Sequence, residues 1–168
     1  MKLLFIGGVF AKENTQEIIL NSKQAVDFAA NIFQEKLIEG LGTIDAEVQI
    51  ISAPFIGHYP KSYSKAWFKG FLISQEKYKY VDFCNIWGVR NFSRYAAIKN
   101  TIEDFISLDD DEKIIIVYSA HTPFLKAAVY AKRKDPRIKI CLVVLDLPQY
   151  MNLSKKQSML YKIAKKYD

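Results

Sequence analysis

The stretch Lys113–Phe124, with the sequence KIIIVYSAHTPF, decides the fold class of this chain. The apolar run Ile114–Val117 is β-branched throughout, which is typical of a strand buried on both faces of a parallel sheet. His121 follows this strand closely, and Pro123 suits the first turn of the helix that is predicted over 123–134. Ligands of open α/β sheets bind beyond the C-terminal ends of the strands. We therefore expect His121 at the ligand-binding edge of such a sheet.

Strands and helices alternate in the same way along the rest of the chain. Apolar runs predict further strands at Leu3–Ile6, Glu47–Ser52, Val81–Ile86 and Lys139–Leu145. Helical spacing predicts helices over 23–39, 94–108 and 154–167, with inward faces of Val26, Ala29, Ala30, Phe33 and Leu37 on the first and of Ile98, Ile102 and Phe105 on the second. The alternation predicts a single Rossmann-like α/β domain: a doubly wound parallel sheet in three layers, α/β/α. This domain is expected over 1–150, and 151–168 is expected to be a basic amphipathic helix of the same domain.

Composition and charge exclude several classes of protein. Half of the 168 residues are hydrophobic, and no apolar run reaches the ~20 residues that cross a bilayer. The chain has neither GxGxxG nor GxxxxGK[ST], and no His or Cys pairing predicts a metal site. Of the 24 Lys and Arg, 11 lie in 126–168 with only 3 acidic residues, so the net charge of +6 belongs to the C-terminal quarter. No nucleic-acid-binding motif accompanies this charge, which therefore favours an anionic lipid surface over a nucleic acid as the macromolecular partner.

Polar residues at predicted strand ends are the candidate ligand contacts. We expect His121 to be the catalytic residue and to contact a sugar or a phosphate group, with Ser119 beside it, although a histidine next to a helix also fits a packed core position. Gly7 and Gly8 end the first strand, where backbone N–H groups could approach a phosphate, although the same pair also fits a tight turn. Asp146 ends the last strand and fits either a ligand hydroxyl or a turn. His58 lies in a loop and is a weaker candidate.

Lysines beside aromatic residues predict a surface that binds a sugar, a lipid tail or the bilayer interface. Lys61, Lys65 and Lys69 are spaced like one face of a helix and flank Trp67. Lys155, Lys162 and Lys166 lie opposite an apolar face in the last predicted helix. Both patterns also fit lysines that simply solvate a packed surface.

Four sequence features together resemble the N-terminal half of GT-B glycosyltransferases of family 4 (group 1), of the bacterial capsule and exopolysaccharide type. They are FIGG at Phe5–Gly8, a following helix whose N-terminal approach faces the cleft, the strand-end histidine of IIIVYSAHTP, and DLPQYM at Asp146–Met151. The family's diphosphate-binding Arg/Lys pair and its E-x7-E region belong to a C-terminal half that has no counterpart in these 168 residues. The resemblance therefore implies the acceptor-side domain alone.

The resemblance also implies an activity and roles for particular residues. It implies transfer of a hexose from a nucleotide-sugar to a glycan or lipid-linked acceptor, without a metal or other cofactor, in the cytoplasm or on the inner face of the membrane. Gly7 and Gly8 would approach the donor diphosphate, and His121 would contact the transferred sugar. The isolated domain would be inactive, since the second GT-B domain completes the site. A stand-alone, flavodoxin-like binding module is the alternative.

Overall fold

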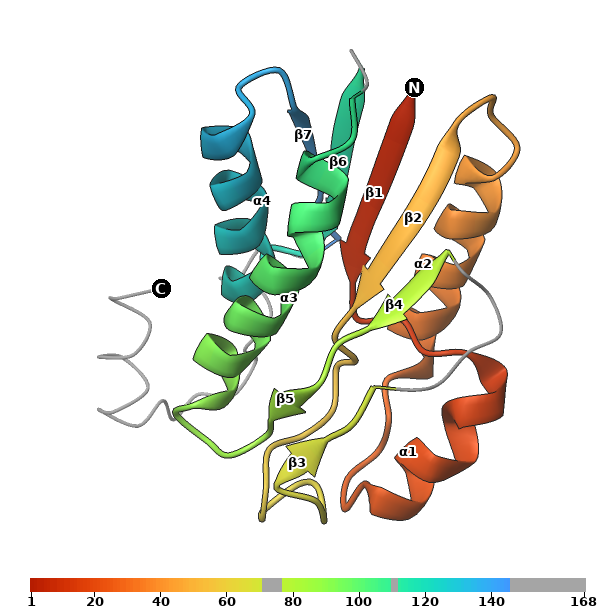
Figure 1. The fold of residues 1–168 in the computed structure, drawn as a ribbon. Helices are drawn as coiled ribbons and strands as arrows, with labels where there is room; N and C mark the ends of the chain where they lie inside the picture. The colour runs from red at the N-terminus through yellow and green to blue at the C-terminus, as the bar shows by residue number, and fades with distance from the viewer. Residues whose placement is uncertain (71–76, 110–111, 146–168) are drawn as a thin grey trace.

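Five parallel strands form the central sheet of the computed structural model, which describes residues 1–70, 77–109 and 112–145 (Figure 1). All neighbouring strands in this sheet are parallel. In spatial order they are β4 (Tyr78–Tyr80), β2 (Glu47–Ser52), β1 (Lys2–Gly7), β6 (Lys113–Tyr118) and β7 (Lys139–Val143). The predicted strands at 3–6, 47–52, 114–117 and 139–145 are thus confirmed, the last of them ending at Val143.

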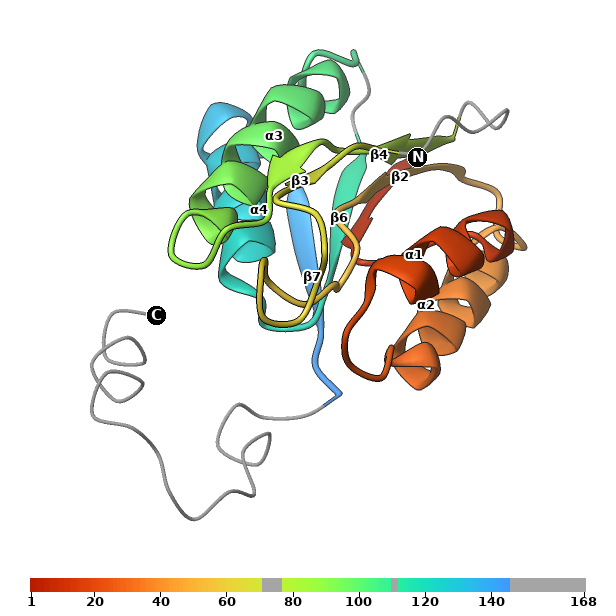
Figure 2. The ribbon, with the colours of Figure 1, turned by 90° about the horizontal axis from the view of Figure 1, so that it is seen from below.

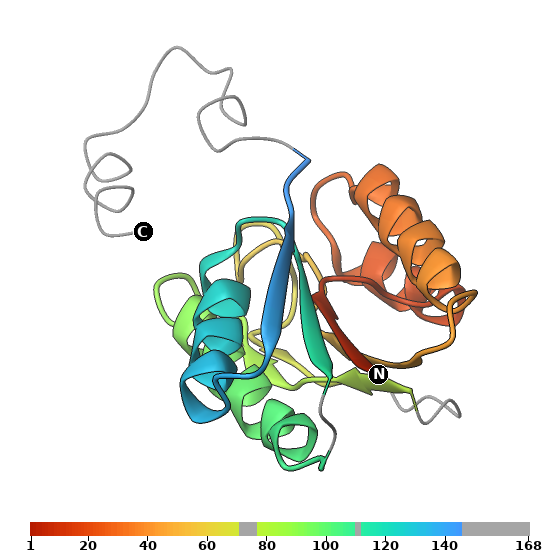
Figure 3. The same cartoon turned by 90° about the horizontal axis from the view of Figure 1, so that it is seen from above.

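Helices cover both faces of the sheet (Figures 2 and 3). A short 3-10 turn, Lys12–Asn14, leads into α1 (Thr15–Asn21), which lies beyond the C-terminal ends of the strands, on the same side of the sheet as α2 (Phe28–Leu41). On the other side lie α3 (Arg90–Ile106) and α4 (Thr122–Lys134). The prediction of a three-layer, doubly wound, Rossmann-like α/β fold is confirmed.

The alternation of side chains along β1 and β6 divides the core between the two faces. Leu4 and Ile6 pack towards α3 and α4, whereas Phe5 packs towards α2. The inward residues predicted for the helix that became α3 are confirmed: Ile98 and Ile102 are fully buried, and Phe105 is buried with them. The helix begins one turn earlier than predicted, at Arg90.

The helix predicted over 23–39 begins only at Phe28, and its buried face is not the predicted one. Asn31, Gln34 and Ile38 are its buried residues, whereas Phe33 is 42% exposed. The amides are buried because they bind the backbone that leaves β1. Asn31 accepts a hydrogen bond from the Phe10 N–H at 2.8 Å and donates to the Phe10 carbonyl at 3.0 Å. The buried face of this helix is therefore partly polar instead of apolar as predicted, because its polar side chains form hydrogen bonds with buried backbone groups.

The segment between β2 and α3 differs most from the prediction. Instead of one strand over 81–86, β3 (Trp67–Phe68) pairs antiparallel with β5 (Phe83–Cys84) in a separate two-stranded sheet. Residues 61–69 form no helix, so the predicted helical face of lysines there is wrong. The helix α1 was not predicted either. The predicted helices over 151–168 and 154–167 lie outside the described residues.

A buried ion pair fixes the end of the sheet opposite to the strand carboxyl ends. Lys113, which is 1% exposed, donates to the carbonyls of Ile106 and Leu108 at 2.8 and 2.9 Å and lies 2.8 Å from the Asp135 carboxylate. Arg137 binds the same carboxylate, 3.0 Å from Nε to Oδ1. These contacts join the end of α3, the start of β6 and the turn after α4.

This cluster predicts a loss of stability in acid. Hydrogen bonds from Arg137 and then Lys113 lower the pKa of Asp135 below its ordinary value of 3.8. Because the folded pKa is the lower one, the ionised carboxylate stabilises the fold above about pH 5, and this stabilisation is lost as the pH falls below about 4. Urea titrations should show that Asp135→Asn destabilises the protein at neutral pH and that the difference from wild type narrows in acid.

The exposed Asp45 provides the control for this pH dependence. Asp45→Asn should stay close to wild type at both pH values, because that side chain makes no ion pair with any described residue. A difference between wild type and Asp135→Asn that does not change with pH would contradict the assignment.

Candidate functional site

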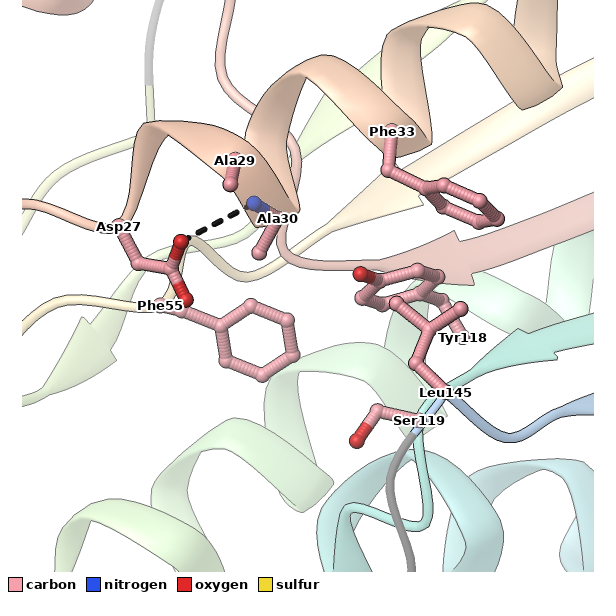
Figure 4. A pocket seen from close by; sticks show the side chains of 8 residues that line it. All are labelled: Asp27, Ala29, Ala30, Phe33, Phe55, Tyr118, Ser119 and Leu145. Carbon is pink, nitrogen blue, oxygen red and sulfur yellow. Dashed lines mark hydrogen bonds between the residues drawn. The ribbon is translucent and has the colours of Figure 1, made fainter. Parts of the chain in front are cut away.

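The chain changes its winding direction between β1 and β6, the two neighbouring strands at the centre of the sheet. After β1 it passes to α1 and α2 on one face, and after β6 it passes to α4 on the other. Ligands of open α/β sheets bind in the crevice that such a switch point creates beyond the strand ends. A pocket of about 450 Å³ lies there, lined by Asp27, Ala29, Ala30, Phe33, Phe55, Tyr118, Ser119 and Leu145 (Figure 4).

The pocket walls are mostly apolar, with a few polar groups at their edge. The ring of Tyr118 lies 6.0 Å from that of Phe33 and 6.2 Å from that of Phe55. Asp27 caps α2 by accepting a hydrogen bond from the Ala30 N–H at 3.0 Å. Ser119, predicted as a ligand contact, lines the pocket and has a φ of 68°. A residue other than glycine in this left-handed region is strained, and such strain concentrates at functional sites.

His121 adjoins the pocket through Phe55, whose ring packs against both Tyr118 and His121. The imidazole lies between Phe55 and Phe124, at centroid distances of 5.5 and 4.8 Å. It makes no capping hydrogen bond to α4, although the His121 carbonyl accepts one from the Phe124 N–H at 3.0 Å. Its ring nitrogens are therefore not used to hold the helix.

The environment of His121 keeps the imidazole neutral. Burial, and then the positive charges of Arg94 and Arg90, lower the pKa of His121 to about 3. A neutral imidazole has one nitrogen that donates and one that accepts. At physiological pH the side chain can therefore hold a hydroxyl group by hydrogen bonding but cannot act as a cation.

Two arginines on α3 stand beside His121. Arg94 is 1% exposed; its Nη2 donates to the Pro54 carbonyl at 2.6 Å, and its Nη1 lies 3.4 Å from Nε2 of His121. Arg90, one turn earlier, is half-buried and donates to the Ile56 carbonyl at 3.3 Å. Both guanidinium groups thus bind the loop after β2, and no described carboxylate forms an ion pair with either.

Gly7 and Gly8 are packed against side chains of the protein itself. A Cβ on Gly8 would lie 2.4 Å from the ring of Phe55, and one on Gly7 would lie 2.5 Å from Oε1 of Gln34. The Gly8 N–H donates to the same Gln34 oxygen at 2.8 Å. The absence of side chains on Gly7 and Gly8 therefore leaves room for Phe55 of the pocket wall and for Gln34 of α2.

The other predicted site residues are dispersed. The backbone carbonyl of His58 accepts from the Ser62 N–H at 2.8 Å, while its imidazole makes no hydrogen bond within the described ranges. Lys61 and Lys69 are exposed, and Lys65 is paired with Glu17 at 2.9 Å. Trp67 lies in β3 and is 51% exposed. Asp146, Lys155, Lys162 and Lys166 lie outside the described residues.

Sequence reasoning missed the arginines, although a signal for one of them was present. Arg94 stands four residues before Ile98 and eight before Ile102, so it continues the inward stripe of that helix. A charged residue on a buried face is rarely there without a partner or a task. Phe55 gives no comparable signal, because its position depends on a long irregular loop.

Fold and site together define a Rossmann-like α/β protein with a pocket at the switch point between β1 and β6. Comparison with protein families, with characterised proteins and with solved structures finds no match to this chain. No helix in the described part of the chain is long and apolar enough to cross a membrane. The same residues contain no group of three His, Cys, Asp or Glu that could hold a metal ion.

Proposed function

We propose that this chain is the acceptor-side domain of a glycosyltransferase that moves a hexose from a nucleotide-sugar to a glycan or lipid-linked acceptor. The observation that carries the proposal is the neutral imidazole of His121 at the switch point, beside an apolar pocket. A hexose offers hydroxyl groups that need both donors and acceptors, and its ring presents apolar faces. Neutral His121, Ser119 and the rings of Phe55 and Tyr118 match both properties.

The chemistry assigned to these residues is orientation rather than proton transfer. A hydrogen bond from His121 to a sugar hydroxyl would hold the anomeric carbon towards the acceptor. The leaving nucleoside diphosphate is an anion, and backbone N–H groups and cationic side chains can stabilise it without a metal ion. Since the described residues provide only one wall of such a cleft, a second GT-B domain would have to supply the other.

The surface next to the site supports a lipid-linked acceptor. Ile86 and Val89 are 42% and 49% exposed, and Trp87 and Phe92 are 68% and 72% exposed, at the start of α3. Large apolar side chains that are exposed together on a protein surface indicate a contact site for another protein or for a membrane. In this proposal the protein acts in the cytoplasm, peripherally at the inner face of the membrane.

A nucleotide-release assay tests the proposed activity. The full-length natural protein should release UDP or GDP from one member of a panel of UDP- and GDP-hexoses when membrane lipid extract is added. Residues 1–168 alone should release none and should bind the same donors more weakly than about 1 mM, because the proposed second domain would form the other half of the cleft.

Two results would overturn this function. Micromolar binding of a nucleotide-sugar to residues 1–168 alone would show a complete site in this domain. Absence of nucleotide release with every donor would favour the stand-alone binding module instead. Isothermal titration of residues 1–168 and a coupled assay of the natural protein distinguish these outcomes.

A further inference from the structure

Arg90 and Arg94 place two positive charges at the site with no described carboxylate to balance them. Arg94 has five N–H donors, yet among the described residues its contacts are the Pro54 carbonyl and a long one to His121. Its Nε is buried and has no hydrogen-bond partner there. Arg90 contributes a single bond to the Ile56 carbonyl. Most of the N–H donors of this pair therefore have no partner among the described residues.

Such an arrangement is unfavourable unless something compensates for it. Like charges four residues apart on a helix repel each other, and burying an unpaired charge carries a large desolvation cost. The ring of Phe83, 4.4 Å from the guanidinium carbon of Arg94, and the two loop carbonyls offset only part of this cost. Burial and the neighbouring Arg90 lower the pKa of Arg94 to about 9, as expected for a cation without an anion.

We propose that Arg90, Arg94 and His121 form a binding site for a phosphate group of the substrate. Arg90 and His121 are half-buried, so they would contact the phosphate oxygens directly. Arg94 lies behind them and would act mainly through its fixed charge. Guanidinium groups bind phosphate through parallel hydrogen bonds, which makes arginine well suited to such a site.

The surroundings of Arg90 indicate what carries the phosphate. The loop and first helical turn around it hold the exposed side chains of Ile86, Trp87, Val89 and Phe92. A phosphate joined to an apolar chain would place its charge on the arginines and its chain on this rim. The inference rests on the proposed function in one respect: it assigns the phosphate to the lipid-linked acceptor of that reaction.

Phosphate binding can be measured without any transferase assay. Inorganic phosphate, added to isotopically labelled residues 1–168, should shift the NMR signals of the His121 ring in a saturable way. It should also raise the pKa of that ring, because an anion offsets the charges of Arg94 and Arg90. Arg90→Gln should weaken phosphate binding at least tenfold.

Matched variants separate the site from general basic charge. Arg133→Gln, an exposed arginine on α4, should bind phosphate like wild type. If Arg94→Gln fails to fold, Arg94→Lys replaces it in the experiment. Lysine keeps the positive charge but lacks the guanidinium group that forms parallel hydrogen bonds, so this variant should bind phosphate with reduced affinity. Absence of any effect of phosphate on His121, or equal binding by Arg90→Gln and wild type, would overturn the proposal.

Vesicles distinguish a lipid phosphate from a soluble one. Residues 1–168 should bind vesicles containing phosphatidic acid more tightly than phosphatidylcholine vesicles, and Arg90→Gln should remove most of that difference. Phosphate binding that depends on Arg90, together with vesicle binding that does not, would overturn the lipid assignment and keep the phosphate site. Phosphate binding without nucleotide release from the natural protein would leave this site standing and reject the proposed transferase.

Discussion

Replacing His121 with phenylalanine should lower the turnover of the natural protein by about 100-fold, the cost of a badly oriented substrate. The phenyl ring can occupy the space between Phe55 and Phe124, so packing is kept while both ring nitrogens are lost. The melting temperature should stay within about 5 °C of wild type, because no described hydrogen bond other than the long contact with Arg94 depends on the imidazole. Turnover in the nucleotide-release assay and thermal unfolding together measure the two effects.

His121→Gln and His58→Gln complete this experiment. Glutamine at 121 can still donate and accept, so it should recover part of the lost turnover, whereas His58→Gln should resemble wild type. Because the pKa of His121 in the unliganded protein is about 3, its titration should not appear in kcat/KM between about pH 5 and about pH 8. Wild-type turnover of His121→Phe would remove His121 from the reaction.

The sequence predicted the elements whose residues repeat with a regular period. β6 and α4 were placed to within a residue because a β-branched run passes directly into a helix with proline in its first turn. The buried face of α3 was predicted because apolar residues define it. The buried face of α2 was not, since Asn31 and Gln34 are buried for their hydrogen bonds to the chain leaving β1.

Long-range pairing explains what sequence periodicity could not predict. β3 and β5 are two residues each and exist only because Trp67 and Phe68 meet Cys84 and Phe83 across the fold. The three lysines at 61, 65 and 69 have helical spacing, but this loop is held by distant contacts, such as the Tyr59 N–H to the Asn85 carbonyl at 2.9 Å. The position of His121 after the end of β6 was predicted because the end of a strand can be recognised from the neighbouring residues. Its arginine neighbours were missed because their proximity depends on how α3 packs beside α4.

Gly8→Ala should destabilise the fold by about 1–3 kcal/mol, the usual cost of forcing an extra methyl group into a packed interior. The new Cβ would meet three ring carbons of Phe55 at 2.4 to 2.8 Å, and one of them is Cγ, which cannot move without moving the whole ring. Phe55 also packs on His121, so the NMR signals of that imidazole should shift in the variant. Urea denaturation measures the loss of stability.

Gly40→Ala is the matched control, because a Cβ at Gly40, near the end of α2, has no atom within 4 Å. Alanine favours helix over glycine, so this variant should gain up to about 1 kcal/mol. Equal stability of Gly8→Ala and wild type would mean that Phe55 moves aside freely. If Gly8 served only as a loop approaching a donor phosphate, alanine would weaken ligand binding and leave the unfolding free energy unchanged. A loss of stability in the absence of any ligand would instead show that Gly8 is required by the pocket wall itself.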